Sequence, residues 1–483
     1  MIRHFSLILC AVVLATGCWK KDEPTVHVDC ELEKIDLTSC DRSGLGAIQP
    51  QGIWNMDITF DDTGERTTGV MKYIGEPQLS GFPISETRVE PNVFTVTSEI
   101  QDATTGLPIK YLFAGCRSSS PTQVEGKFRR CTNGTLDLAG TFQAKRVQRR
   151  EGESDASGVE LVSETALPRG VPVDVFVAGG YAYVSARDSG IYIYDISKPT
   201  APHKVAELVP QDDSWNSVWV KDGTMYIAST NKGVLLYDVT NPAEPLALKS
   251  FPSDAPDVRS ITGDGTWLYA ASPFPNAEII VFDATNPHEL VVAKRYFVEQ
   301  TQPALGDRPY EVQVRNGLLY VSHWTYGLAV SDVSTPKAPK LLGRFSYTDA
   351  TSRTVNVGTI GNRTLAFEAG EGWGSELRVL DVSSPTNITQ VAELTGRPEV
   401  SIRRAKLVGT KLYVAHYQDG LRVLDVSNPN EPTQVGYFNT WKETDTSRGN
   451  VFFEGVTDVA VPGDGYVYAT DSSRGLLVFR ETP

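Results

Sequence analysis

One ten-residue line recurs along most of the chain, and this repeat constrains the fold more than any other feature. It reads Gly-Ile-Tyr-Ile-Tyr-Asp-Ile-Ser-Lys-Pro at 190–199 and returns at 233–242, 278–287, 327–336, 376–385 and 420–429, with a degenerate copy at 475–480. The shared aspartates are Asp195, Asp238, Asp283, Asp332, Asp381 and Asp425, at spacings of 43, 45, 49, 49 and 44 residues. A period of this length is typical of one four-stranded β-propeller blade.

Each repeat divides into four short strands separated by turn residues. In the first repeat we expect strands at 173–178, 181–186, 191–194 and 204–208. Their β-branched and aromatic residues exclude helical repeats. We expect each shared aspartate to accept hydrogen bonds from turn amides, because the turns lack the further oxygen ligands that calcium needs. The sequence therefore predicts an all-β fold with a seven-bladed propeller over 159–483.

The seventh repeat, at 456–480, contains only three strands. The segment 159–167 precedes the first inner strand and is similar to the outer strands at 204–209 and 390–394. Pairing this segment with the seventh repeat would close the ring and remove two unpaired sheet edges. We therefore predict that residues 159–165 form the outer strand of the last blade.

The repeated line resembles the LVIVD repeat family of bacterial and archaeal cell-surface proteins. The resemblance lies in Leu-Arg-Val-Leu-Asp at 377–381 and 421–425 and in Ile-Ile-Val-Phe-Asp at 279–283. It covers roughly residues 159–483. The resemblance implies a propeller on a cell surface, and it implies no particular activity.

A different pattern precedes the repeats. Between 52 and 147 apolar residues alternate with polar ones, as in Trp54, Met56, Ile58 and Phe60, and turn signals separate the runs. We expect a small antiparallel β meander or barrel over 30–148, then a polar linker over 149–158. A barrel of this kind is either a packed spacer, which we favour, or a container for an apolar ligand.

Four cysteines, Cys30, Cys40, Cys116 and Cys131, lie in the part of the chain before the repeats. Four thiols in an oxidising compartment indicate two disulfides, and three pairings are possible. We favour Cys30–Cys40 and Cys116–Cys131, because these pairs close the shortest loops. Zinc is the alternative, but no Cys-x-x-Cys spacing or histidine partner supports it.

The first residues are typical of an exported lipoprotein. A basic start and a short apolar run end in Leu-Ala-Thr-Gly-Cys at 14–18, which resembles the bacterial lipobox. We therefore expect a signal peptide over 1–17, a lipid on Cys18 and a tether over 18–29. Because Trp19 and not aspartate follows the lipid site, resemblance to bacterial lipoproteins favours the outer membrane. An ordinary secretory signal with an incidental cysteine is the alternative.

Two groups of residues are candidates for a ligand site. The start of each inner strand should line the channel mouth, which contains Asp174, Ser217, Arg259, Glu311, Arg404 and Asp458. The turns between second and third strands share the same face, by analogy with other propellers. They contain His323, Trp324, Trp373, His416 and Tyr417. Mixed charges in a water-filled mouth and aromatic loop tips are the non-functional alternatives.

The chain contains no nucleophile elbow, HExxH motif or phosphate loop. His323 and His416 occupy similar repeat positions, but two ligands do not make a metal site. A net charge of −14 argues against general nucleic-acid binding. We expect a membrane-anchored envelope module without catalysis, cofactor or metal, which binds a protein or glycan. The rival function is an exported hydrolase or lyase that uses Asp174, Glu311 and Asp458 as acid and base.

Overall fold

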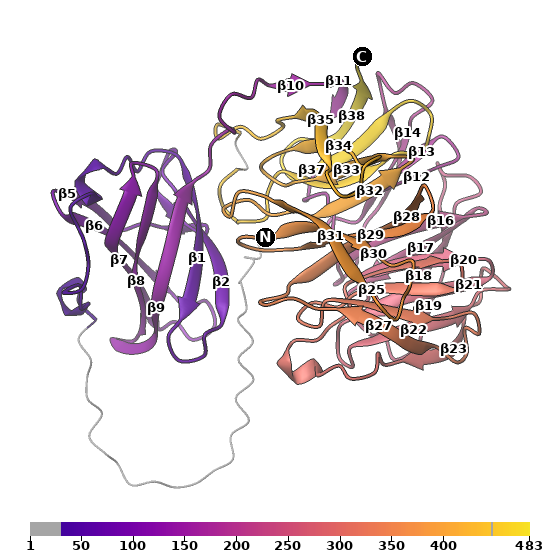
Figure 1. The fold of residues 1–483 in the computed structure, drawn as a ribbon, viewed down its shortest axis with the longest axis horizontal. Coiled ribbons are helices and arrows are strands. Elements are labelled where there is room, and N and C mark those ends of the chain that lie inside the picture. Colours follow the sequence, from indigo (N-terminus) through magenta and orange to yellow (C-terminus); the bar gives the residue numbers. More distant parts are fainter. Residues whose placement is uncertain (1–29, 446–447) are drawn as a thin grey trace, which may run out of the picture.

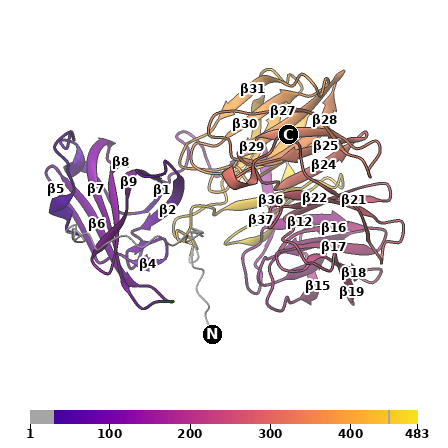
Figure 2. The same cartoon turned by 90° about the horizontal axis from the view of Figure 1, so that it is seen from below.

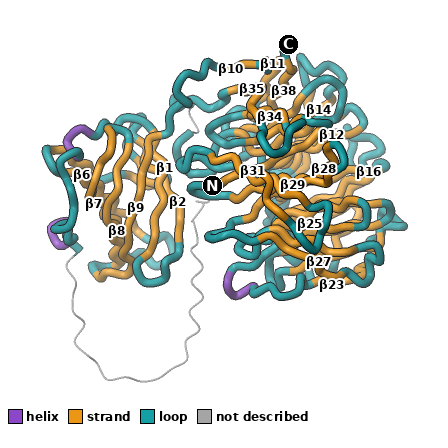
Figure 3. Tube along the Cα trace, viewed as in Figure 1, coloured by secondary structure: helices purple, strands orange, loops and turns teal. Residues whose placement is uncertain are grey.

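The computed structural model describes residues 30–445 and 448–483, and nearly all of its regular structure is β-strand (Figures 1 and 3). A nine-stranded sheet lies beside a ring of seven further sheets formed by the described residues (Figure 2). The helices are three short 3-10 turns, at Leu32–Lys34, Leu45–Ala47 and Pro303–Leu305. None of the helices in the described part of the chain could cross a membrane. The predicted signal peptide, Cys18 and the tether lie outside the described residues.

The nine-stranded sheet forms the predicted small β domain. Its spatial order is β4-β3-β2-β1-β9-β8-β7-β6-β5, and every neighbouring pair is antiparallel. The strands are β1 (Ile53–Phe60), β2 (Arg66–Lys72), β3 (Gln78–Leu79), β4 (Phe82–Pro83), β5 (Glu86–Glu90), β6 (Val93–Gln101), β7 (Pro108–Ser120), β8 (Gln123–Thr132) and β9 (Thr135–Arg146).

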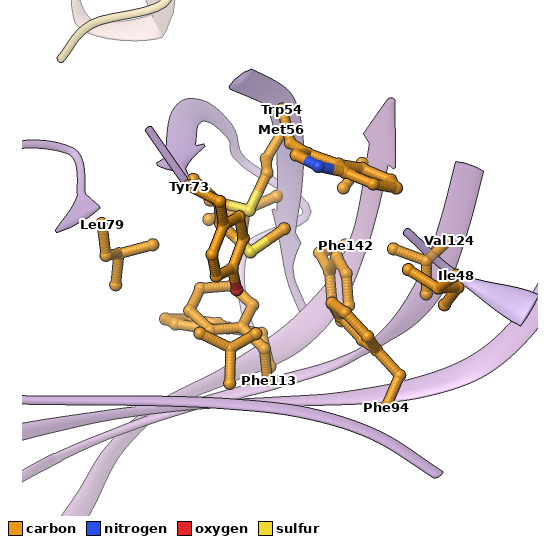
Figure 4. Close-up of a cluster of buried hydrophobic side chains, with 14 of the residues drawn as sticks. Ile48, Trp54, Met56, Tyr73, Leu79, Phe94, Phe113, Val124 and Phe142 are labelled. Carbon is orange, nitrogen blue, oxygen red and sulfur yellow. The ribbon is translucent and has the colours of Figure 1, made fainter. Parts of the chain in front are cut away.

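The interior of this curved sheet is packed with side chains. The alternating residues Trp54, Met56, Ile58 and Phe60 all point into it, as period-two patterning requires. They pack against rings from β6, β7 and β9, among them Phe94, Phe113 and Phe142 (Figure 4). The rings of Phe113 and Phe142 meet edge to face at 5.2 Å. This packing is that of a filled core, which is the spacer alternative.

The disulfides join Cys30 to Cys131 and Cys40 to Cys116, so the predicted pairing is wrong. The register of β7 and β8 explains the error. Cys131 lies opposite Lys110, six residues along β7 from Cys116. Six residues of strand span about 20 Å, far beyond the reach of a disulfide. Each bridge instead fastens the segment before β1 onto the sheet.

Seven sheets make the propeller, six with four strands and one with a short fifth strand, and the inner strands contact one another in cyclic order. Blade 1 is β12 (Asp174–Ala178), β13 (Tyr181–Ser185), β14 (Ile191–Asp195) and β15 (His203–Leu208). Blade 2 is β16 (Trp215–Lys221), β17 (Thr224–Ser229), β18 (Gly233–Asp238) and β19 (Leu246–Phe251). Blade 3 is β20 (Ser260–Asp264), β21 (Trp267–Ser272), β22 (Glu278–Asp283) and β23 (Val291–Tyr296). Blade 4 is β24 (Glu311–Arg315), β25 (Leu318–Ser322), β26 (Leu328–Asp332) and β27 (Lys340–Phe345).

The remaining blades follow the same plan. Blade 5 is β28 (Ser352–Ile360), β29 (Arg363–Gly370), β30 (Glu376–Asp381) and β31 (Thr389–Thr395). Blade 6 is β32 (Arg404–Val408), β33 (Lys411–Ala415), β34 (Leu421–Asp425) and β35 (Thr433–Phe438). Blade 7 contains β36 (Val456–Ala460), β37 (Val467–Asp471) and β38 (Gly475–Glu481).

The repeated aspartates terminate the third strand of each blade and stabilise the turn that follows. Each carboxylate accepts a hydrogen bond from the backbone N–H two residues later, as Asp195 does from Ser197 at 2.8 Å. The same bond recurs at Asp238, Asp283, Asp332, Asp381 and Asp425. The predicted structural role of these residues is therefore confirmed.

The ring closes as the sequence predicts. Strand β11 (Val159–Thr165) pairs antiparallel with β38 and supplies the fourth strand of blade 7. Val159 and Phe479 are both buried where the two strands meet the neighbouring blade. The short strand β10 (Ala156–Ser157) adds to the outer edge of β35, so part of the expected linker belongs to a blade.

The β domain packs on one side of the propeller's loop face, the end formed by the second-to-third turns and the outer-to-inner connections. Asn55 donates to the backbone carbonyl of Glu399 at 2.6 Å, and Lys145 pairs with the Glu399 carboxylate. Ile53 and Val70 form an apolar cluster with Phe452. The loops covered in this way belong to blades 5 to 7, and the loops of blades 1 to 4 lie away from these contacts.

Candidate functional site

The central channel contains a cavity of about 360 Å³. In six of the seven blades, the first lining residue of the inner strand lies at one level of it: Asp174, Ser217, Ser260, Glu311, Arg404 and Asp458. Five of these were predicted. Arg259 is not among the residues that line the cavity, because Ser260 occupies the equivalent position in blade 3. The arginine lies one residue earlier, nearer the loop face.

Arg404 organises the charges of this level, and its side chain is largely buried. Its guanidinium lies 2.6 Å from Asp174, 3.3 Å from Asp458 and 3.7 Å from Glu311. The three carboxylates hold the pKa of Arg404 above its ordinary value despite the burial. One buried cation therefore neutralises part of a threefold negative charge.

Asp174 is the carboxyl group that this crowding affects most. Burial raises the pKa of Asp174 to about 7; the neighbouring Asp458 charge adds to the rise, and Arg404 opposes it. Two adjacent carboxylates with one cation titrate as a coupled group.

The same polar side chains connect neighbouring blades. Val218 N–H donates to Asp174, and Val175 N–H donates to Asp458, both at 2.9 Å. Equivalent bonds to side-chain oxygens join Val312 to Ser260, Val357 to Gln313 and Leu407 to Asn356. Because each bond crosses a blade boundary, this level of the channel holds the ring together.

A second ring lies one residue earlier in each blade, toward the loop face. It contains Val173, Asn216, Arg259, Tyr310, Arg353, Arg403 and Thr457. Four of these residues donate the same backbone bond to the second strand of their blade, which establishes their equivalence. In blades 2, 5 and 7 the ladder skips Asn216, Arg353 and Thr457, so these three residues lie in β-bulges. Bulges re-aim side chains next to functional sites.

Few carboxylates balance the arginines of this ring. Glu371 pairs with Arg353 at 3.2 Å and contacts Arg403 at 3.8 Å. Arg259 pairs with Asp257 at 2.7 Å. Burial and the charge of Arg403 lower the pKa of Arg353 to about 10, which reflects the concentration of positive charge.

Three second-to-third turns place a large side chain above the ring. Arg187, Trp324 and Tyr417 occupy equivalent positions, since each forms an isolated bridge to the next blade. All three have left-handed backbone, with φ of 46°, 39° and 36°. Such a conformation is a strained one for bulky residues and concentrates at functional sites.

The contacts of these turn residues differ. Tyr417 is buried and donates a 2.6 Å hydrogen bond to Glu371. Trp324 is partly exposed and packs against Tyr310 at 5.2 Å, and Arg353 lies over the same tyrosine ring. Arg187 is exposed, and its side chain forms no hydrogen bond or ion pair with the described residues. We call Arg187, Arg259, Tyr310, Trp324, Arg353, Glu371, Arg403 and Tyr417 the mouth of the propeller.

Three predicted loop residues lie elsewhere. Trp373 packs against the contact between the two domains and not in the mouth. His416 is buried beside Asp419, which also pairs with Arg150 and Arg397 at that contact. His323 is fully buried, and burial lowers its pKa to about 4. In the described part of the chain, no three His, Cys, Asp or Glu side chains form a metal site.

The sequence prediction missed Arg187, Tyr310, Arg353 and Arg403. The signal was present one position before the channel residues, where the repeats align Arg259, Tyr310 and Arg403. Blade 5 was not aligned from the sequence, and the structure places Arg353 at the equivalent position.

Four segments match the family model of the LVIVD repeat, at residues 170–207, 214–251, 310–347 and 404–440. They correspond to blades 1, 2, 4 and 6. No curated protein matches the chain.

Solved structures with similar folds include the computationally designed Ika8 protein, with 8% identity over 66% of this chain and 99% of that one, at a TM-score of 0.47. A chain of the Mitotic Checkpoint Complex has 12% identity over 70% of this chain and 99% of that one, at a TM-score of 0.49. Sqt1 from Chaetomium thermophilum has 11% identity over 83% of this chain and 96% of that one, at a TM-score of 0.49. These similarities are too distant to bear on function. The chain is a seven-bladed β-propeller that carries LVIVD repeats, joined to a disulfide-bonded β domain.

Proposed function

We propose that the protein is a non-enzymatic binding module of the cell envelope, with its ligand site at the mouth of the propeller. The observation that carries this proposal is the left-handed backbone of Arg187, Trp324 and Tyr417 at one level of the mouth. Each such residue costs about 1–3 kcal/mol and persists only where the surrounding fold enforces it. The equivalent turns of three blades adopt this unfavourable backbone conformation, and each of them places a large side chain at the mouth.

The position of the β domain supports the same site. It contacts loops of blades 5 to 7 through Asn55, Lys145 and the apolar cluster around Phe452, and the linker adds a pair between Arg150 and the buried Asp419. Arg187 in blade 1 and Trp324 in blade 4 lie outside these contacts. A partner therefore has access to the mouth from the side of blades 1 to 4.

Two disulfides and LVIVD repeats indicate an extracellular or envelope protein. Within the proposal, a lipid on Cys18 attaches the protein to the outer membrane, and the partner is a protein or a glycan. Mass spectrometry of the mature chain should find acyl groups on Cys18, and Cys18→Ala should release the protein from membranes. Wild-type protein without the acyl mass would contradict the anchor.

Site-specific photo-crosslinking tests the ligand site. A benzophenone amino acid replaces Leu305, which is 68% exposed on the loop face, in cells that produce the protein. The control replaces Lys198, which is exposed in the turn between β14 and β15. We expect an adduct at Leu305 and none at Lys198, because only the first position borders the mouth. Equal labelling, or labelling at Lys198 alone, would contradict a ligand at the mouth.

One observation favours the rival enzyme, namely the raised pKa of Asp174 beside Asp458 in a cavity. However, Asp174 accepts bonds from Val218 N–H and Arg404, and Asp458 accepts from Val175 N–H and Arg404. Carboxylates occupied in this way are poorly placed to act on a substrate. Hydrolysis of a chromogenic glycoside or ester that is lost in Asp174→Asn would support the enzyme.

A further inference from the structure

We infer that the mouth binds an acidic segment of a partner protein, whose carboxylates pair with Arg187 and Arg259. This inference rests on the proposed function and specifies the ligand. The two residues are the accessible arginines of the mouth: Arg187 is exposed, and the Arg259 side chain is 28% exposed. Arg353 and Arg403 lie deeper and supply positive charge behind them.

The charge of the mouth favours an anion. Four guanidinium groups lie there, and the carboxylates that contact them are Glu371, shared by two of them, and Asp257. The protein packed around the exposed Arg187, and then the charges of Arg403 and Arg259, lower the pKa of this residue, although Tyr417 and Asp188 oppose them. Although the chain has a net charge of −14, positive charge is thus concentrated at the mouth. Guanidinium forks match the geometry of carboxylates, which they bind through two parallel hydrogen bonds.

The chemistry around the arginines favours a protein over a polysaccharide. Phe274 is 43% exposed and lies under the guanidinium of Arg308, at 4.1 Å from the ring centre. The Leu305 carbonyl accepts from Thr325, which directly follows Trp324, so this exposed leucine borders the mouth. Apolar side chains beside Trp, Tyr and Arg are the composition of protein–protein binding centres. An acidic segment with apolar neighbours would satisfy both parts of this surface.

Fluorescence anisotropy of the full chain with labelled poly-L-glutamate tests the inference, and alginate provides an acidic glycan for comparison. Arg187→Glu reverses a charge that has no side-chain partner among the described residues. The matched control Lys198→Glu makes the same charge change on an exposed turn of the same blade. Circular dichroism and the melting temperature verify that both variants fold.

We expect poly-L-glutamate to bind the natural chain, Arg187→Glu to weaken binding by about tenfold or more, and Lys198→Glu to change it by less than about twofold. Added salt should weaken binding, because the arginines are accessible to solvent. Binding unchanged by Arg187→Glu, or no binding of poly-L-glutamate, would overturn the inference. Binding of alginate alone would also overturn it, by identifying a glycan ligand.

The photo-crosslinking experiment distinguishes failure of the acidic-segment inference from failure of the proposed function. Adducts at Leu305 without poly-L-glutamate binding would reject the acidic segment and retain the ligand site. Absence of adducts at Leu305 would reject the ligand site itself.

Discussion

At the scale of single residues, neighbouring positions of one strand have different roles. Asp174 and Asp458 point into the channel, accept backbone bonds from the next blade and share Arg404. One residue earlier, Arg259 and Arg353 have few anionic partners. The inner position therefore holds the ring together, whereas the outer position belongs to the mouth, where we propose the ligand site.

The pKa of Asp174 leads to a prediction about stability. Its folded-state pKa, about 7, exceeds the ordinary value near 3.8, so the folded protein binds this proton more tightly than the unfolded chain. The resulting stabilisation is complete below about pH 4 and is lost as the pH rises through about 7. Asp174→Asn cannot titrate, so its free energy of unfolding should decline less over this window.

Urea unfolding at several pH values between about 4 and 8 measures this difference. The exposed, non-lining Asp222 offers a control, and Asp222→Asn should keep the decline of the natural chain. An identical pH dependence in Asp174→Asn and the natural chain would show that Asp174 is not the group responsible.

At the scale of elements, β11 is the closing strand of the propeller. Its pairing with β38 covers an edge that contains Leu476, Val478 and Phe479, and Glu160 pairs with Arg480 at its outer face. A chain that begins at residue 158 retains this strand, whereas a chain that begins at residue 169 loses it. Each lost ladder bond is worth roughly 0.5–1.5 kcal/mol, and the exposed apolar edge should promote aggregation.

Size-exclusion chromatography and thermal melting of the two truncated chains test the closure. Both lack the β domain and expose Trp373 and Phe452 equally, so any difference between them comes from β11. We expect a folded monomer from the longer chain and aggregation or a much lower melting temperature from the shorter one. Equal behaviour would contradict the role of β11.

The elements also show where sequence-based prediction succeeds. The blades and the closing strand could be predicted because each repeat encodes its own strands and turns, and because the missing strand was unique. The disulfide pairing could not, because the distance between Cys116 and Cys131 depends on the register of β7 against β8. The mouth was predicted in part: Arg259, Trp324 and Tyr417 lie there, whereas Trp373 packs against a domain contact that no local pattern encodes.

At the scale of the whole molecule, buried charges hold the linker between the two domains on the propeller. Asp419 is held by Arg150 and Arg397, and its hydrogen bond with His416, followed by the charges of Arg397 and Arg150, lowers its pKa well below the ordinary value despite burial. Arg422 pairs with Glu153 beside it, and Asn439 also bonds Glu153. The β domain therefore acts as a fixed support on blades 5 to 7, and it leaves the mouth open toward blades 1 to 4.

Hydroxyl-radical footprinting of the protein on intact cells, compared with the purified protein, tests the central claim that the mouth is the ligand site. Phe274, Leu305 and Trp324 report on the mouth, and the exposed Val291 and Val435 report on the outer strands. We predict that the mouth residues are protected on cells and that the outer valines react equally in both samples. Protection of the outer valines with an unprotected mouth would contradict the account.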